Sequence, residues 1–269
     1  MARFGTFAYG IACYAVFFAV FLYGIGFIGG FMTPTLLDGL PRRPFGEALA
    51  IDLALLGVFA VQHSGMARPA FKRWWTRIVP EAVERSTYVL LSSLALIAVY
   101  AYWEPIDGVI WSVREGPARV AIIGLYLAGW MLLLYSTFLI DHFDLFGLKQ
   151  VWRRLAGKVY IPPQFHTPSL YGIVRHPLYI GWLIIFWSAP IMTAAHLLFA
   201  LATTIYILAA IQLEERDLVS AFGERYVEYR RRTPMLVPRL WAGPREDGPR
   251  QDAPRKSDAP PPVGRSPSA

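Results

Sequence analysis

The sequence has little of what a soluble or secreted protein needs. A single cysteine, Cys13, excludes an intramolecular disulfide. Charged residues make up only 17% of the 269 residues, where a soluble domain carries about a quarter. Hydrophobic residues reach 55% instead. This composition argues against a soluble domain and indicates an integral membrane protein.

Two further classes of site lack support. The five histidines are scattered and form neither an H-x-x-x-H nor an H-E-x-x-H pair, so no metal site is predicted. A net charge of +7 could suggest nucleic acid, but the basic residues lie between apolar runs and near the end of the chain. They form no continuous basic face, so no nucleic-acid partner is expected.

Long apolar runs dominate the chain. A bilayer core needs about 20 apolar residues in a helix, and five regions meet or approach that length: Thr6–Phe31, Phe45–Gln62, Ser86–Trp103, Ala118–Ile140 and Leu178–Leu213. The first run is too long for a signal peptide and is expected to be retained. The last is too long for one perpendicular helix, and Pro190 interrupts it. We therefore predict an all-α integral membrane bundle of about five to six helices, with a C-terminal helical hairpin that either crosses fully or dips in and returns.

Loop charge predicts the orientation. The segments 63–85 and 141–175 are rich in lysine and arginine, whereas the other two loops hold only Arg42, Arg43 and Arg114, with Arg119 at the next helix start. By the positive-inside rule, the rich loops and both chain ends are expected in the cytoplasm. Five tryptophans near predicted helix ends are expected to form an interfacial belt: Trp74, Trp75, Trp103, Trp111 and Trp152.

The last part of the chain has a different composition. Residues 242–269 are rich in proline, glycine and charge, with almost no large apolar residue. Such a segment cannot bury enough surface to fold. The sequence therefore predicts a membrane domain over residues 1–241 and a disordered tail over residues 242–269.

The strongest candidate site flanks the predicted hairpin. Ionisable groups at membrane level are costly and mark functional positions. The hairpin should bring Arg175, His176 and Tyr179 next to Glu214 and Glu215. Amide groups at the first turn after the arginine–histidine pair could bind a carboxylate, and the glutamates could bind hydroxyls or a cationic centre. An interfacial salt-bridge role explains either glutamate alone equally well.

These motifs resemble a known superfamily. R-H-P-L-Y-x-G, an apolar hairpin, then E-E-R-D-L, F-G-x-x-Y-x-x-Y and a closing P-x-x-x-P are similar to the isoprenylcysteine carboxyl methyltransferase-like superfamily. Its members are membrane enzymes that use S-adenosylmethionine. Within it the chain resembles the bacterial methanethiol S-methyltransferases, also in Phe186–Ala200 and in Q-H-S-G-M-A-R-P-A-F-K-R-W-W, Gln62–Trp75. The resemblance covers most of residues 45–240.

The resemblance implies a site and a reaction. It implies methyl transfer to a small thiol in a bacterial inner membrane, with the lipid bilayer and the thiol as partners. The acceptor pocket is expected near the first two spans, closed and apolar, so that it fits a volatile thiol and not a prenylated cysteine. A pocket at the cytoplasmic side would hold S-adenosylmethionine through Arg175, His176, Pro177, Leu178, Tyr179, Gly181, Glu214 and Glu215, closed by Tyr226, Tyr229 and Arg230.

Within that site the catalytic candidates are Arg175, Glu215, His142 and Asp52. His142 follows an aspartate at the end of the fourth run and could accept the thiol proton, as could His166 in the next loop. For both histidines an interfacial hydrogen-bonding role is the alternative. Asp52 could equally orient a base or close a structural hydrogen bond between helices.

Other functions stay open on the sequence. Methylation of an isoprenylcysteine carboxylate or of a lipid amine would use the same donor site. A non-enzymatic, denitrification-associated membrane protein has a similar R-H-P stretch but usually lacks the downstream motifs. A channel or transporter would need polar residues spread along several spans.

Overall fold

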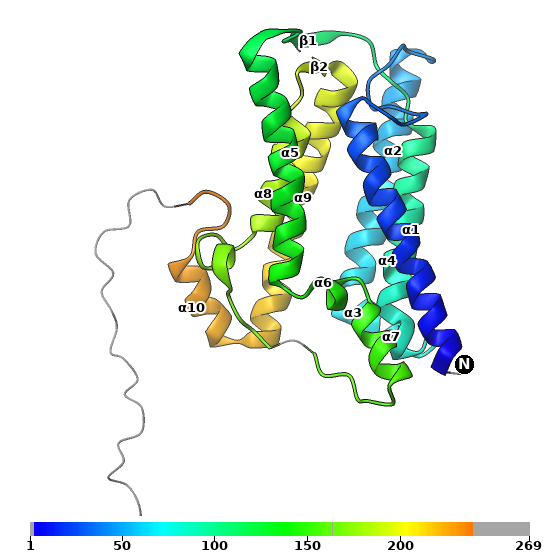
Figure 1. Cartoon of the computed structure of the whole chain (residues 1–269), viewed down its shortest axis with the longest axis vertical. Helices are drawn as coiled ribbons and strands as arrows, with labels where there is room; N and C mark the ends of the chain where they lie inside the picture. Colours follow the sequence, from blue (N-terminus) through cyan, green and yellow to red (C-terminus); the bar gives the residue numbers. More distant parts are fainter. Residues whose placement is uncertain (1–2, 163, 239–269) are drawn as a thin grey trace, which may run out of the picture. The chain divides into compact units, whose positions relative to one another are not determined.

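The computed structural model describes residues 3–162 and 164–238 of the chain, and these form an α-helical bundle with one small two-stranded sheet (Figure 1). The predicted tail, residues 242–269, and the predicted domain end at residue 241 lie outside the described residues.

Within the described residues, five helices are long and apolar enough to cross a membrane. They are α1 (Arg3–Gly29), α2 (Phe45–Ala67), α4 (Glu81–Tyr102), α5 (Gly116–Leu139) and α9 (Ala194–Phe222). Shorter elements are α3 (Pro69–Trp75), α6 (His142–Leu145), α7 (Leu148–Leu155), the 3-10 turn η1 (Ser169–Gly172), α8 (Pro177–Trp187) and α10 (Glu224–Arg232). The long helices coincide with the predicted apolar runs, which confirms the all-α membrane bundle.

The C-terminal hairpin reaches the far end of the bundle. Helix α8 has 11 residues and α9 has 29, and β2 (Ile191–Thr193) lies between them. Strand β2 pairs antiparallel with β1 (Val109–Ser112), which lies in the loop between α4 and α5. The tip of the hairpin therefore lies at the same end of the bundle as that loop.

The helices form two groups that lie side by side (Figure 1). One group packs α1 and α2 against α4, with α7 beside α1, and the other packs α5 against α8 with α9 and α10. Close approach of α5 and α8 depends on glycine, since a Cβ atom at Gly181 would lie 2.9 Å from the amide nitrogen of Leu133. Contacts between α2 and α9 join the two groups.

The two ends of the bundle differ in charge. One end, here called the basic end, holds the start of α1, together with α3, α7 and α10 (Figure 1). Its cationic residues include Arg3, Lys72, Arg73, Arg77, Lys149, Arg153, Arg154 and Lys158. At the opposite end Arg42 and Arg43 pair with Glu104 at 3.2 and 3.3 Å. The loops that are rich in lysine and arginine thus lie together at one end of the bundle.

One tryptophan departs from the predicted interfacial belt. Trp74 and Trp152 are half exposed, as a belt requires, but Trp103 is only 1% exposed. Its indole nitrogen donates to the carbonyl of Leu37 at 3.1 Å. The loop after α1 thus covers Trp103, and its assignment to the belt is wrong.

Asp52 lies at the end opposite to the basic end, where it is fully buried. Its Oδ1 accepts a hydrogen bond from the backbone N–H of Glu104 at 2.9 Å, directly after α4. Asp52 is not among the described residues that line the cavities of the molecule. Two roles were expected for Asp52. The geometry supports the structural role, in which its carboxylate accepts a hydrogen bond from another segment of the bundle.

Replacing Asp52 tests this role. In Asp52→Ala the Glu104 amide loses its partner, which costs about 1–3 kcal/mol for a buried group, so the thermal midpoint in detergent should fall by several degrees. Asp52→Asn, which keeps an acceptor oxygen, should lose less. The control is Asp107→Ala, since Asp107 is exposed and bonds only the adjacent Gly108 amide. A loss of ligand binding at an unchanged midpoint would contradict the structural role.

Candidate functional site

A buried ion-pair cluster connects the start of α8 to the C-terminal part of α9. Arg175 Nε donates to Glu215 Oε1 at 2.6 Å, and His176 Nε2 lies 3.1 Å from the same oxygen. His176 and Glu215 are each only 5% exposed. The length of the hairpin explains this meeting, because α9 returns along α8 to the level where α8 begins.

Beside this cluster, Tyr179 and Glu214 form a second contact between α8 and α9. The Tyr179 hydroxyl donates to Glu214 Oε2 at 3.0 Å, and His176 Nδ1 lies 4.0 Å from the same carboxylate. The Glu214 side chain is 42% exposed, so its carboxylate remains accessible to a ligand. The structure thus brings together all five residues that the hairpin topology places in one site.

The segment after α10 folds back onto the start of α8. The amides of Arg175 and His176 donate to the carbonyls of Pro234 and Met235 at 2.9 and 3.2 Å. Arg175 Nη1 also donates to the carbonyls of Arg230 and Thr233 at 3.0 and 2.5 Å. These two amides are therefore not available to a ligand carboxylate, and the guanidinium holds the C-terminal segment in place.

Helix α10 adds aromatic side chains to the site. Tyr226 is 2% exposed, and the Tyr229 hydroxyl donates to the carbonyl of Tyr171 at 2.6 Å. Burial raises the pKa of Tyr229 to about 12, although the Arg175 guanidinium lowers it in part. Burial likewise raises the pKa of Tyr226, so both phenols remain protonated hydrogen-bond donors at neutral pH.

A cavity of about 580 Å³, here called the central cavity, lies between the two helix groups. One wall comes from the predicted site and its surroundings: Arg175, His176, Leu178, Tyr179, Tyr206, Glu214, Asp217, Tyr226 and Tyr229. The opposite wall comes from α2 and α4: His63, Ser64, Ala67, Arg68, Arg85 and Tyr88. An apolar part is formed by Phe17, Phe21, Leu133, Phe146 and Trp182.

Several predicted site residues lie behind this wall. Glu215, Pro177, Gly181 and Arg230 are not among the described residues that line the central cavity. Glu215 holds Arg175 and His176, and Gly181 faces the backbone of α5. Arg230 lies 3.9 Å from Glu215 and is half exposed. These four residues shape the site from outside the cavity.

His142 lies in a different place. Its Nε2 lies 2.8 Å from the hydroxyl of Tyr14, and its Nδ1 lies 2.8 Å from that of Thr137. Burial lowers the pKa of His142, which favours the neutral ring. It lines a separate, open hollow with Asp141 and His166. Since both ring nitrogens have hydroxyl partners, the geometry favours the hydrogen-bonding alternative.

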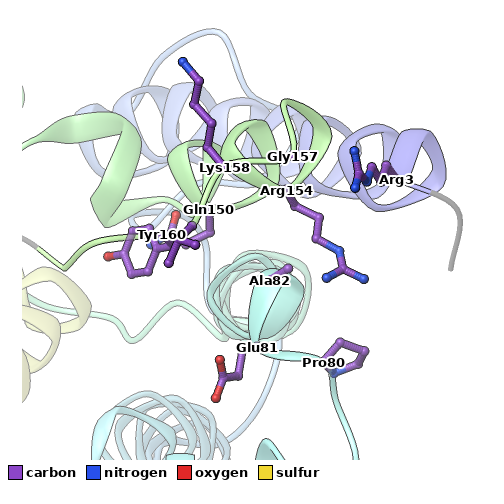
Figure 2. A pocket seen from close by; sticks show the side chains of 10 residues that line it. Arg3, Pro80, Glu81, Ala82, Gln150, Arg154, Gly157, Lys158 and Tyr160 are labelled. Carbon is purple, nitrogen blue, oxygen red and sulfur yellow. The ribbon is translucent and has the colours of Figure 1, made fainter.

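A third hollow, of about 480 Å³, lies at the basic end between α1, α4 and α7 (Figure 2). Arg154 and Lys158 extend in different directions, and the carboxylate of Glu81 turns away from Arg154 (Figure 2). The hollow contains no part of the motifs that carry the resemblance, so the central cavity is the candidate site. The described residues contain no cluster of three or more His, Cys, Asp or Glu side chains suited to a metal.

Sequence reasoning did not predict that residues of α2 and α4 line the central cavity. His63 and Ser64 belong to the Q-H-S stretch, which carried part of the resemblance but was assigned no role. Ser64 Oγ lies 3.0 Å from the hydroxyl of Tyr206, and Arg68 pairs with Asp217 at 2.9 Å. These two contacts connect α2 to α9 across the central cavity.

The fold and the cavity define a multi-pass helical membrane protein with an ionisable, partly enclosed site near the basic end of its bundle. Known proteins specify this class further. The chain is 53% identical over 230 residues to the methanethiol S-methyltransferase of Crocosphaera subtropica, covering 86% of this chain and 90% of that protein. It is 51% identical over 238 residues to the methanethiol S-methyltransferase of Mycobacterium tuberculosis, covering 88% and 98%.

A third relative is methanethiol S-methyltransferase 2 of Bradyrhizobium diazoefficiens, 51% identical over 246 residues and covering 91% of this chain and 95% of that protein. No protein-family model matches the chain, and no solved structure matches it. On these relatives the chain belongs to the methanethiol S-methyltransferase family. It is therefore a membrane methyltransferase, and such an enzyme uses a methyl donor.

Proposed function

We propose that the protein transfers the methyl group of S-adenosylmethionine to methanethiol, which gives dimethyl sulfide and S-adenosylhomocysteine. The observation that carries this proposal is that Arg175, His176 and Glu214 line one wall of the central cavity, with Glu215 holding Arg175 and His176 from behind that wall. The names of the relatives support the acceptor.

The chemistry of the cavity fits S-adenosylmethionine. The donor is an amphipathic molecule with a carboxylate, an ammonium, a sulfonium, ribose hydroxyls and an adenine ring. The cavity offers cations at Arg68 and Arg85, carboxylates at Glu214 and Asp217, and aromatic rings around them. Its volume of about 580 Å³ lies within the range of ordinary ligand pockets. A bound donor supplies a methyl group already activated on a sulfonium.

The protein's own residues then align the reactants and exclude water. Glu214 would bind the cationic part or the ribose hydroxyls of the donor, with Tyr179 orienting its carboxylate. His176, held by Glu215, and Leu178 would complete that wall. Tyr226 and Tyr229 would close it from α10. Proximity in such a pocket can contribute about 7 kcal/mol or more to the lowering of the barrier.

The apolar part of the cavity supports a small acceptor. Phe17, Phe21, Leu133 and Trp182 come from α1, α5 and α8, and a volatile thiol needs no more than such an apolar pocket. We also propose that the membrane domain extends over residues 1–241 in a bacterial inner membrane. By the positive-inside rule its basic end, which holds the start of α1 and helix α10, would face the cytoplasm. On the loop charges we propose that both termini lie on that side as well.

Two measurements test this function. Cells that express the chain and are fed methanethiol should release dimethyl sulfide, detected by gas chromatography of the headspace, whereas cells with an empty vector should not. The purified protein should bind S-adenosylmethionine in a calorimetric titration. Efficient methylation of a farnesylcysteine carboxylate or of a lipid amine would contradict methanethiol as the acceptor. If the protein does not bind S-adenosylmethionine, the proposed methyl transfer from this donor is refuted.

A further inference from the structure

We propose that His63, on the wall opposite to the predicted donor site, accepts the proton of the acceptor thiol. This inference rests on the proposed function and adds the catalytic base, which the sequence placed at His142 or His166. A thiol attacks as its thiolate, so a proton acceptor that faces the same cavity as the methyl donor is needed.

His63 is held by hydroxyl groups from α4. Its Nδ1 lies 3.2 Å from Ser92 Oγ and 3.1 Å from the Tyr88 hydroxyl. The Tyr88 hydroxyl donates its own hydrogen to the backbone carbonyl of His63 at 3.2 Å. Both hydroxyl oxygens can therefore accept the hydrogen of a ring protonated on Nδ1. The Tyr88 oxygen also lies 3.2 Å from Nε2, but its hydrogen is directed to the backbone carbonyl of His63. In this tautomer Nε2 therefore keeps its lone pair and is the proton acceptor.

The packing around His63 fixes the plane of its ring. The imidazole stacks on Phe59 with ring centroids 5.2 Å apart and an interplanar angle of 20°. Ser64, the next residue, bonds Tyr206 on α9. His63 is therefore oriented by α2 and α4, and its neighbour connects it to the helix that carries Glu214.

The other ionisable groups of the cavity are less suited to this role. His176 has a carboxylate near each ring nitrogen, an arrangement that suits a hydrogen-bond donor. Asp217 is paired with Arg68, and His166 Nδ1 bonds the carbonyl of Gln164 in its own loop. His63 has only neutral hydroxyl partners, and Arg85, which lines the same wall, favours a thiolate there.

The S–H bond of the thiol breaks, its proton moves to Nε2 of His63, and the electron pair stays on the thiol sulfur. That pair forms the new bond to the methyl carbon, and the pair of the breaking carbon–sulfonium bond remains with the departing sulfur. The imidazolium then releases its proton to water, which returns His63 to its starting state.

His63→Gln tests the assignment in the full-length protein in detergent or nanodiscs. With methanethiol, kcat/KM should fall about 100-fold or more, the range of general-base catalysis, while the calorimetric affinity for S-adenosylmethionine stays unchanged. With methaneselenol, which has the same shape but ionises far more readily, most of the wild-type rate should return. His142→Gln is the matched comparison and should keep the wild-type ratio of the two rates.

Three outcomes decide the matter. Wild-type turnover of methanethiol by His63→Gln would overturn the assignment, and so would an equal loss with the thiol and the selenol, which indicates a merely structural role. If His63→Gln does not fold, Ser92→Ala and Tyr88→Phe should each lower thiol turnover several-fold and spare the selenol. A wild-type protein that binds the donor but makes no dimethyl sulfide would overturn both the proposed function and the base.

Discussion

Glu215→Ala is expected to abolish methyl transfer while the protein still inserts into the membrane. The substitution leaves Arg175 and His176 buried without the carboxylate that both contact at 2.6 and 3.1 Å. Removing one partner of a buried ion pair destabilises the folded site by about 3–5 kcal/mol, enough to displace Arg175 and His176 from the cavity wall. If restoring that wall on binding costs even the lower figure, donor affinity and dimethyl sulfide formation should both fall about 100-fold or more. His176→Ala should have the same effect, since its imidazole lines the central cavity.

The control for this prediction is Glu224→Ala in the first turn of α10. Glu224 is exposed, and its contact with Arg231 is at 4.0 Å, so a surface pair of this kind contributes little. The Glu224→Ala protein should bind the donor as the wild type does. Wild-type turnover in purified Glu215→Ala and His176→Ala would refute the site assignment.

Arg175→Lys is expected to release the C-terminal segment even though it keeps the positive charge. The guanidinium donates to Glu215 and to two backbone carbonyls, those of Arg230 and Thr233, and a lysine ammonium cannot reproduce this planar, fork-shaped set of contacts. Each lost hydrogen bond of a charged group contributes about 1.5–3 kcal/mol. Donor affinity should therefore fall about 10- to 100-fold, and the segment after α10 should become sensitive to limited proteolysis.

Arg231→Lys is the matched substitution on the same helix. Arg231 contacts only exposed glutamates of α10, at 3.8 and 4.0 Å, so the change should alter neither affinity nor proteolysis. If Arg175→Lys behaves like Arg231→Lys in both measurements, the C-terminal segment does not depend on the guanidinium.

Hydropathy and proline position were enough to predict the central feature of the site. An apolar run too long for one helix has to double back, and doubling back brings Arg175 and His176 to the level of Glu214 and Glu215. No finer detail was needed, because both ends of a hairpin lie at the same side of a membrane. The first four predicted runs match α1, α2, α4 and α5 to within five residues at each end, whereas α9 continues past Leu213 to Phe222.

Which side of each helix is turned toward the central cavity could not be predicted in the same way. His63 ends an apolar run, and only the packing of α2 against α4 and α9 directs it into the central cavity. Asp52 was recognised as costly in its span, but its partner, a backbone amide after α4, has no sequence signal. Trp103 lies near a helix end, as a belt residue would, but a loop remote in sequence covers it. In each case the deciding contact is between segments far apart in the chain.

The backbone bonds from Arg175 and His176 to Pro234 and Met235 have a consequence for synthesis of the protein. The polypeptide is synthesised from its N-terminus. The helices that surround the cavity therefore enter the bilayer before Pro234 and Met235 have been made. A nascent chain interrupted ahead of Pro234 would carry every long helix and yet leave two buried amides without acceptors. Competence to bind a ligand is thus acquired only after Pro234 and Met235 have been synthesised.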